Sequence, residues 1–153
     1  MTSPEQRLVG LGLELPSLFP PAADYRPCRR NGDRLYVSGH GPMRDGVAVF
    51  TGKVGRDLDV AEARLSAELT MLNVLASIKD ELGELSRVRG FVRLSVFVNS
   101  TEDFAQHHLV ADGASGLLGR VFGPSAAHAR YAVGVAGLPF GIATEIEAVA
   151  EVE

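Results

Sequence analysis

The stretch Val88-Arg-Gly-Phe-Val-Arg-Leu-Ser-Val-Phe-Val-Asn99 sets the fold class, because its residues alternate in character along its whole length. A period of two is typical of a β-strand, whose successive side chains point to opposite faces of a sheet. One parity is apolar and comprises Val88, Val92, Leu94, Val96 and Val98. The other parity is mixed and comprises Arg89, Phe91, Arg93, Ser95 and Phe97. Two phenylalanines on the mixed face indicate a subunit interface there.

A long helix is predicted immediately before this strand, over residues 59–82. Asp59 and Glu62 have the spacing of a capping box, and Gly83 is a residue type that commonly follows a helix C-terminus. Helical spacing also relates four apolar residues that we expect to face the core, namely Leu65, Leu69, Leu72 and Ala76. A second helix is predicted to begin at Thr101 or Asp103 and to end near Phe122.

Five further strands are predicted, over residues 25–30, 34–38, 47–50, 128–136 and 142–152. Asn31-Gly32 is typical of the two-residue turn of a β-hairpin. The resulting order, β-β-β-α-β-α-β-β, predicts a six-stranded sheet with two helices packed on one face. Because two helices cannot cover both faces of such a sheet, we expect another copy of the chain to cover the second face.

The chain is divided into an N-terminal segment, residues 1–24, and a main domain over residues 25–153. Ser3 and Pro4 suit the start of a short helix. Three prolines prevent regular helix in the segment that follows, which is expected to be an extended arm that wraps the domain or reaches a neighbour: Pro16, Pro20 and Pro21.

Composition excludes several classes of protein. The 153 residues are 46% hydrophobic and 22% charged, which is ordinary for one globular domain, and the net charge of -4 does not favour nucleic-acid binding. Cys28 is the single cysteine, so an internal disulfide and a cysteine-rich zinc site are excluded. The sequence shows no signal-peptide pattern and no apolar run of the roughly 20 residues that span a membrane, so we expect a cytoplasmic protein.

Several short motifs occur together in one order. They are Ser38-Gly39-x-x-Pro42, Asn73 within the long helix, Gly83-Glu-Leu-Ser-Arg-Val88, Asp103-Phe-Ala105, His128-Ala-Arg130-Tyr-Ala-Val, Leu138-Pro139 and Glu145-Ile-Glu147-Ala148. In combination this order resembles the Rid/YjgF family, the reactive intermediate deaminases, also named L-PSP endoribonucleases. The resemblance covers about residues 25–152. It implies an α+β, chorismate-mutase-like (YjgF-like) fold with a six-stranded, mainly antiparallel sheet and two helices on one face.

The resemblance also implies a homotrimer with ligand clefts between its subunits. Deaminating members hydrolyse imine forms of enamines that carry a carboxylate, giving a keto acid and ammonia, and they need no metal or organic cofactor. By motif, Arg130 would grip the carboxylate and Glu145 would help to position water. The resemblance also makes Tyr25 a substrate-binding candidate. Ser38 and Gly39, at the end of a predicted strand, and His128, beside Arg130, are further substrate-binding candidates by their positions.

The residue types and their positions support the proposed role of Arg130 in binding a carboxylate. Arginine is a planar, permanently charged, bidentate donor, as a carboxylate ligand requires, and small residues share its strand face. His128 lies two residues before Arg130 on that face and is predicted to carry a proton near neutral pH. A two-residue turn at Pro139-Phe140 would pair Gly134 with Glu145 on neighbouring strands. Arg130 would then lie four residues, or about 13 Å, along the strand from Gly134.

Other hypotheses about the function remain open at this point. His128 and Tyr131 occupy positions where deaminating members usually have proline and serine or threonine, which indicates a divergent subgroup. A non-catalytic trimer that binds a small carboxylated metabolite is the alternative to a deaminase. An endoribonuclease is not favoured, since no histidine and lysine set on a basic groove is present. No metal site is expected, because the four histidines lack ligand spacing.

Overall fold

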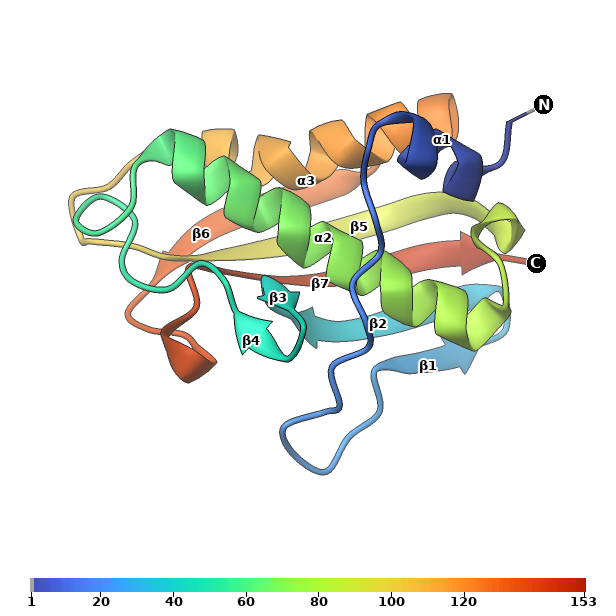
Figure 1. The fold of residues 1–153 in the computed structure, drawn as a ribbon, viewed down its shortest axis with the longest axis horizontal. Helices are drawn as coiled ribbons and strands as arrows, with labels where there is room; N and C mark the ends of the chain where they lie inside the picture. Colours follow the sequence, from blue (N-terminus) through green and yellow to red (C-terminus); the bar gives the residue numbers. More distant parts are fainter. Residues whose placement is uncertain (1) are drawn as a thin grey trace.

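The strand at residues 88–99 lies inside the main sheet, with a neighbour on each side (Figure 1). In the computed structural model, which describes residues 2–153, this strand is β5 (Val88–Asn99). It pairs in parallel with the edge strand β6 (Ala129–Val135) and antiparallel with β7 (Thr144–Val152). The other strands are β2 (Arg34–His40) and β1 (Cys28–Asn31), giving the order β1-β2-β7-β5-β6.

The main sheet has five strands, so the expectation of six is corrected. The segment predicted as a strand over residues 47–50 is reduced to β4 (Val47–Ala48), which pairs with β3 (Met43–Arg44) in a separate two-stranded sheet. Asp45 and Gly46 both have positive φ, as a tight hairpin turn of this kind requires. The first hairpin turn is also shifted, because Asn31 pairs with Arg34 and leaves the two residues between them as the turn.

The strict alternation predicted along β5 is interrupted. The pairing of β5 with β7 shifts register twice, between Val88 and Gly90 and between Phe91 and Arg93. Such bulges insert an extra residue and move later side chains to the other face of the sheet. Phe91 is therefore 4% exposed and belongs to the core, whereas Val92 is 41% exposed. The prediction was wrong for these two residues and held from Leu94 onward.

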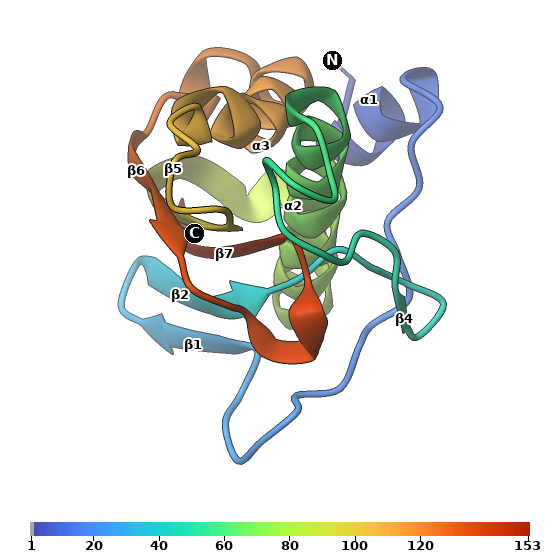
Figure 2. The same cartoon turned by 90° about the vertical axis from the view of Figure 1, so that its left-hand side faces the viewer.

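Two long helices cover one face of the sheet, side by side (Figure 2). The first is α2 (Val60–Leu82), which begins at the predicted capping box of Asp59 and Glu62. Leu65 is 56% exposed, so the predicted stripe reaches the core only from its later residues. The second is α3 (His107–Phe122), which starts later than predicted, because backbone hydrogen bonds hold Thr101 against Val54 in a loop.

A third helix and three short 3-10 turns complete the chain. The N-terminal helix α1 (Pro4–Gly10) is capped by Ser3, and its Arg7 side chain donates to the carbonyl of Val121 at the end of α3. The 3-10 turns are η1 (Leu85–Arg87), η2 (Gly123–Ala126) and η3 (Pro139–Gly141). Among the helices of residues 2–153, none combines the length and the apolar character that a membrane span requires.

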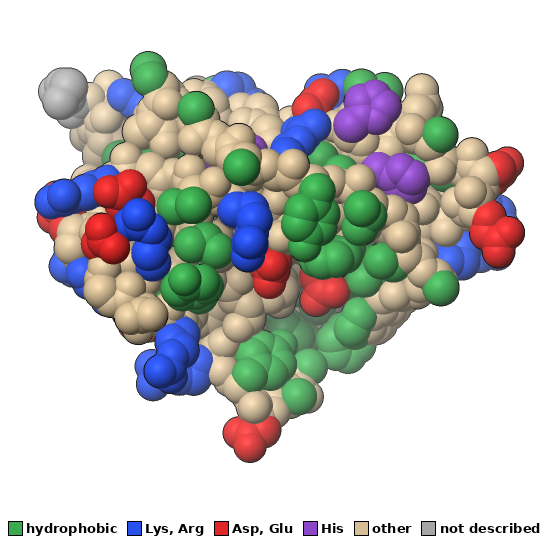
Figure 3. All heavy atoms as spheres, turned by 180° about the vertical axis from the view of Figure 1, so that it is seen from behind, with side chains coloured by type: hydrophobic (Ala, Val, Ile, Leu, Met, Phe, Trp, Pro, Cys, Tyr) green, Lys and Arg blue, Asp and Glu red, His purple; other side chains and the backbone are tan. Residues whose placement is uncertain are grey.

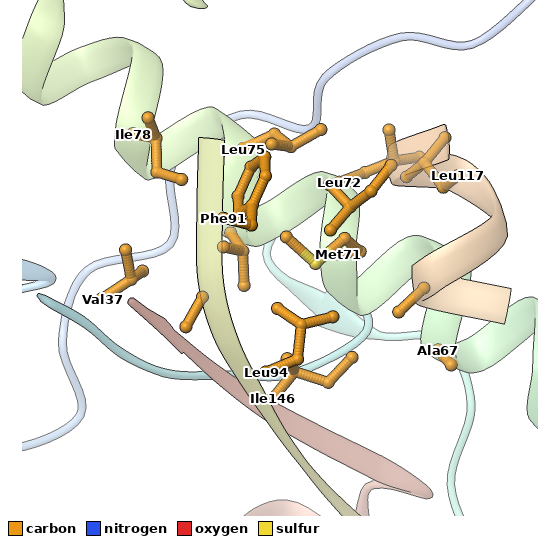
Figure 4. Packing of buried hydrophobic residues seen from close by; sticks show 14 of the residues in the cluster. Val37, Ala67, Met71, Leu72, Leu75, Ile78, Phe91, Leu94, Leu117 and Ile146 are labelled. Atoms are coloured by element: carbon orange, nitrogen blue, oxygen red, sulfur yellow. The ribbon is translucent and has the colours of Figure 1, made fainter. Parts of the chain in front are cut away.

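The hydrophobic core lies between the sheet and the two long helices (Figure 4). Met71, Leu72 and Leu75 of α2 are at most 2% exposed and lie toward Leu94 of β5 and Ile146 of β7. Burying a side chain of this size contributes about 1.5–3 kcal/mol. This layer therefore supplies much of the free energy that holds β5 and β7 in place, and it fixes which face of each strand looks outward.

The other face of the sheet carries no helix and is partly apolar (Figure 3). Four large side chains on it are at least 40% exposed: Tyr36, Val92, Tyr131 and Val133. Phe97 packs edge-on against Tyr131 there, with ring centroids 6.1 Å apart. Hydrophobic side chains gather over the middle of this face between charged ones. That a further copy of the chain covers this face stays a prediction.

Candidate functional site

A cavity of about 360 Å³ lies where β2 ends and β7 begins. The N-terminal arm forms one wall through Phe19 and Pro20, and the turn η3 forms another through Phe140. Gly39 of β2 and Glu145 of β7 form part of the lining between them. We call this the Glu145 pocket. Its volume is within the range of ligand sites, which is about 300–1,000 Å³.

Glu145 is the acidic side chain of this pocket. Burial raises the pKa of its carboxyl group above the ordinary range, and the negative charge of Glu147 raises that pKa further. The backbone of Gly39 approaches the carboxylate closely, since a Cβ on Gly39 would lie 2.5 Å from Glu145 Oε1. Glycine at position 39 therefore leaves the space that the carboxyl group occupies.

His40 lies beside Glu145 in the pocket lining and is hydrogen-bonded at both ring nitrogens. Its Nδ1 donates to the carbonyl of Ser38 at 2.6 Å, because a carbonyl can only accept. Its Nε2 therefore accepts from the hydroxyl of Ser77 at 2.7 Å. Burial lowers the pKa of His40, so the ring is neutral near pH 7 and supplies no positive charge to the pocket.

Arg130 lies in a second group of residues, which we call the Arg130 cluster: Asp112, Ser115, His128 and Arg130. The Arg130 Nη1 donates to Asp112 Oδ1 and to Ser115 Oγ, both at 2.9 Å, and Nη2 donates to the carbonyl of His108. All these acceptors belong to α3, which therefore fixes the guanidinium group. Arg130 Nε has no acceptor among residues 2–153 and remains available to an anion.

His128 is held in the same cluster. Its Nδ1 donates to the carbonyl of Ala126 at 2.5 Å, and its Nε2 lies within hydrogen-bond distance of the Ser115 hydroxyl oxygen, at 2.9 Å. Ser115 thus links His128 and Arg130 through one oxygen, which accepts from the guanidinium group.

The predicted hairpin between β6 and β7 is wrong, because β5 lies between the two strands. Arg130 pairs with Leu94 across the β5–β6 ladder, and Glu145 pairs with Phe97 across the β5–β7 ladder. Leu94 and Phe97 are three residues apart on a part of β5 without a bulge, so they point to opposite faces. Arg130 lies on the helix-covered face and Glu145 on the open face. One chain does not bring these two side chains together.

The predicted binding residues divide between the two regions. Tyr25 and Gly39 line the Glu145 pocket, and His128 lies in the Arg130 cluster. The Ser38 hydroxyl donates to the carbonyl of Arg26 at 2.6 Å, so it holds the arm against β2 and has no further hydrogen to donate to a ligand.

The pocket residues that sequence reasoning missed include Phe19, His40 and Phe140. A signal existed for His40, which stands between two glycines directly after the recognised Ser38-Gly39 motif. No comparable signal existed for the two phenylalanines, because they come from segments 121 positions apart in the chain that meet only in the folded protein, with ring centroids 6.3 Å apart.

The described residues contain no group of three or more histidine, cysteine, aspartate and glutamate side chains arranged to hold a metal ion. Cys28 is buried beneath the arm, and burial together with the nearby carboxylates of Glu81 and Asp80 raises the pKa of its thiol to about 12. This thiol is therefore a poor nucleophile and a poor metal ligand.

Comparison with known proteins gives a consistent result. A family model described as "YjgF/chorismate_mutase-like, putative endoribonuclease" matches residues 5–151. Protein TCP17 of Trypanosoma cruzi is 43% identical over 142 residues, which cover 92% of this chain and 89% of that protein. The crystal structure of Atu1372 from Agrobacterium tumefaciens, a protein of unknown function, is 46% identical with a TM-score of 0.93, over 98% of this chain and 92% of that one.

A second crystal structure supports the same fold assignment. It is described as "a putative endoribonuclease" from Shewanella oneidensis, and it is 33% identical with a TM-score of 0.96. The alignment covers 99% of this chain and all of the other. The N-terminal arm and α1 are therefore included in the shared architecture.

Proposed function

Because the chain belongs to the YjgF/chorismate mutase-like family, we propose that it hydrolyses imines derived from amino acids, releasing a 2-keto acid and ammonia. The observation that carries this proposal is the Glu145 carboxyl group, which lies in a largely apolar pocket with a raised pKa. A carboxylate with a raised pKa is a better general base than an ordinary one, because its affinity for a proton is closer to what the reaction requires.

The proposed reaction has two steps that balance. Glu145 in its charged form removes a proton from water while the water oxygen bonds to the imine carbon, and it passes this proton to the imine nitrogen, which gives a carbinolamine. Glu145 then takes the hydroxyl proton of the carbinolamine and passes it to the nitrogen, the C–N bond breaks, ammonia leaves, and the carbon becomes the carbonyl carbon of the keto acid. Enamine substrates first tautomerise to the imine. No metal or organic cofactor takes part in these steps.

Arg130 is proposed to bind the carboxylate of the substrate. Contacts with α3 hold its guanidinium group, and its unoccupied Nε offers one donor of a bidentate pair. Since Arg130 and Glu145 lie on opposite faces of one sheet, we propose that the complete site forms between subunits. A homotrimer is the assembly proposed, with the open sheet face and its exposed aromatic side chains against neighbouring copies.

Mixed oligomers test the reaction and the location of the site together. Arg130→Ala and Glu145→Gln are each expected to abolish turnover of 2-iminopropanoate, which an L-amino acid oxidase supplies from alanine. When the two variants are unfolded, mixed in equal amounts and refolded, some clefts receive an intact arginine from one copy and an intact glutamate from the other. Random assembly predicts about a quarter of the wild-type activity.

Two results would contradict the proposal. Full activity in either single variant would remove its residue from the reaction, and inactive mixtures of well-folded oligomers would place both residues in one chain's site. Keto-acid binding without any imine hydrolysis would favour the alternative, a carboxylate-binding protein without catalytic activity.

A further inference from the structure

The residues that line the Glu145 pocket indicate which side chain the ligand has, in addition to its carboxylate. Resting on the proposed function, we propose that the pocket selects imines with an apolar side chain of about four carbons or more, such as those derived from leucine or phenylalanine. The arm of this chain forms the subsite for that side chain.

The apolar part of the pocket lining comes from three separate segments. The arm contributes Phe19 and Pro20, the end of β2 leads to Met43, and η3 contributes Phe140. Phe19 and Phe140 meet edge to face, with ring centroids 6.3 Å apart. An apolar ligand group placed between these side chains is removed from water on several sides, which is the condition for hydrophobic binding.

Phe140 is held in an unusual state at this wall. Its φ is 60°, in the left-handed region that a bulky residue rarely adopts, and its side chain is 61% exposed. Backbone strain of this kind persists where the surrounding structure imposes it, and it is concentrated at ligand sites. An exposed aromatic ring at the mouth of a cavity offers a surface that a ligand's apolar group can cover.

Two of the four polar side chains of the lining are already hydrogen-bonded, and the other two are Tyr25 and Glu145. Both ring nitrogens of His40 are hydrogen-bonded, and the side-chain amide of Asn73 donates to the carbonyls of Met43 and Leu69. A hydroxyl or charged side chain on the ligand would therefore leave water and find few partners. Leaving such a group unpaired is unfavourable, so the pocket discriminates against polar side chains.

The size of the cavity favours a ligand larger than an alanine-derived imine. At roughly 30 Å³ for each water-sized group, a cavity of 360 Å³ accommodates about a dozen such groups. An alanine-derived imine has only six heavy atoms and would leave about half of this space to water. A leucine-derived imine has three more carbon atoms and brings them against the apolar wall.

Competition between imines tests this inference. An L-amino acid oxidase generates the imine from leucine, phenylalanine, alanine or serine, and semicarbazide traps whatever imine the protein does not hydrolyse. The kcat/KM of the wild-type protein is expected to be at least about tenfold higher for the leucine-derived than for the alanine-derived imine, since added methylene groups in such a pocket give discrimination of this order.

Phe19→Ala should reduce this ratio about tenfold, because it removes one side of the apolar wall. Leu18→Ala is the matched control: Leu18 is the adjacent arm residue, is 51% exposed and does not line the pocket. Its ratio should equal that of the wild type. Both substitutions change partly exposed arm positions, and circular dichroism checks that each variant is folded.

A binding measurement separates failure of this inference from failure of the proposed function. Thermal shifts with 4-methyl-2-oxopentanoate and with pyruvate report side-chain preference without any turnover. Equal or better hydrolysis of small imines overturns the selectivity and leaves the reaction standing. Absence of all hydrolysis, with tighter binding of the branched keto acid that depends on Phe19, overturns the reaction and supports the subsite. Absence of both overturns both.

Discussion

The Glu145 side chain and the Arg130 cluster lie on opposite faces of the same sheet, and the Glu145 pocket differs from the cluster in several physical respects. The pocket is largely apolar, is walled by the arm, and holds one carboxyl group whose pKa is raised by burial. The cluster is polar and partly open, and its cation is bonded to three acceptors on α3. One region suits proton transfer and an apolar group, whereas the other suits an anion.

Neither region alone forms a complete site for a molecule that carries both a carboxylate and an apolar side chain. Arg130 is held by contacts with α3, but the apolar pocket that would accept a ligand's side chain lies at Glu145. Glu145 has the pocket but no cation, since His40 is neutral there. The difference between the two regions therefore favours an assembly in which one copy supplies each half.

Among the milder substitutions, the largest effect is expected from Arg130→Lys. Lysine keeps the positive charge but cannot reproduce the guanidinium fork or its three contacts with α3. Loss of a charged bidentate interaction is expected to lower kcat/KM for imine hydrolysis about 100-fold, which corresponds to about 3 kcal/mol. Steady-state kinetics of ammonia release would measure it, and activity near the wild-type level would show that the anion binds elsewhere.

A smaller effect is expected from Gly39→Ala in the pocket. The added Cβ would lie 2.5 Å from Glu145 Oε1, so the carboxyl group must move from its position. We expect kcat/KM to fall about tenfold while the fold is retained, because a shift of about 1 Å at a reacting group is costly.

Gly116→Ala serves as the control for this change. Gly116 lies within α3, and a Cβ there would meet nothing within 4 Å. Alanine is favoured over glycine in a helix by about 1 kcal/mol, so this variant should unfold at a higher temperature with unchanged kinetics. If the two variants lose activity equally, the close approach of Gly39 to Glu145 does not matter for the reaction.

The third prediction concerns stability rather than rate. Burial raises the pKa of Glu145 in the folded protein, so ionising this group opposes folding. The penalty is present above the raised pKa and disappears as the pH falls to the ordinary glutamate pKa of about 4.3. Glu145→Gln should therefore raise Tm at pH 8, and the two melting curves should converge toward pH 4. A difference that grows toward acid pH would contradict the assigned direction of the shift.

The smallest effect is expected at Cys28, beneath the arm. The wild-type thiol should react very slowly with iodoacetamide at pH 8, since it is 3% exposed and its pKa is raised to about 12. Phe19→Ala should increase the alkylation rate several-fold by loosening the arm that also walls the Glu145 pocket. Mass spectrometry would follow the modification. Rapid alkylation of the wild-type protein would show that the arm does not cover this part of the domain.

Much of the fold was predictable because its signals are local. The capping box of Asp59 and Glu62 was predicted from four neighbouring residues and is present at the start of α2. The alternation from Leu94 onward assigns the faces of β5 correctly. The bulge near Phe91 was not predictable, since it depends on how β5 pairs with β7. The prediction of a sixth strand in the sheet was wrong for the same reason. Val47 pairs with Arg44 in a separate hairpin and not with the main sheet.

The candidate site divides in the same way. Arg130, Glu145, Tyr25 and Gly39 were identified from motifs that are continuous in the chain, and their roles remain predictions. Their arrangement was not predictable: the sequence suggested a hairpin that would place Arg130 and Glu145 along neighbouring strands. The structure places β5 between those strands, which puts the two side chains on opposite faces.

The sequence by itself determined the helices, most of the strands and the residue types that carry the proposed chemistry, because these depend on interactions over a few neighbouring residues. Only the tertiary structure decided which strands are neighbours, where the arm lies and which carboxyl group is removed from solvent. Strand order and desolvation depend on segments far apart in the chain, such as Phe19 and Phe140, whose contact no local pattern records.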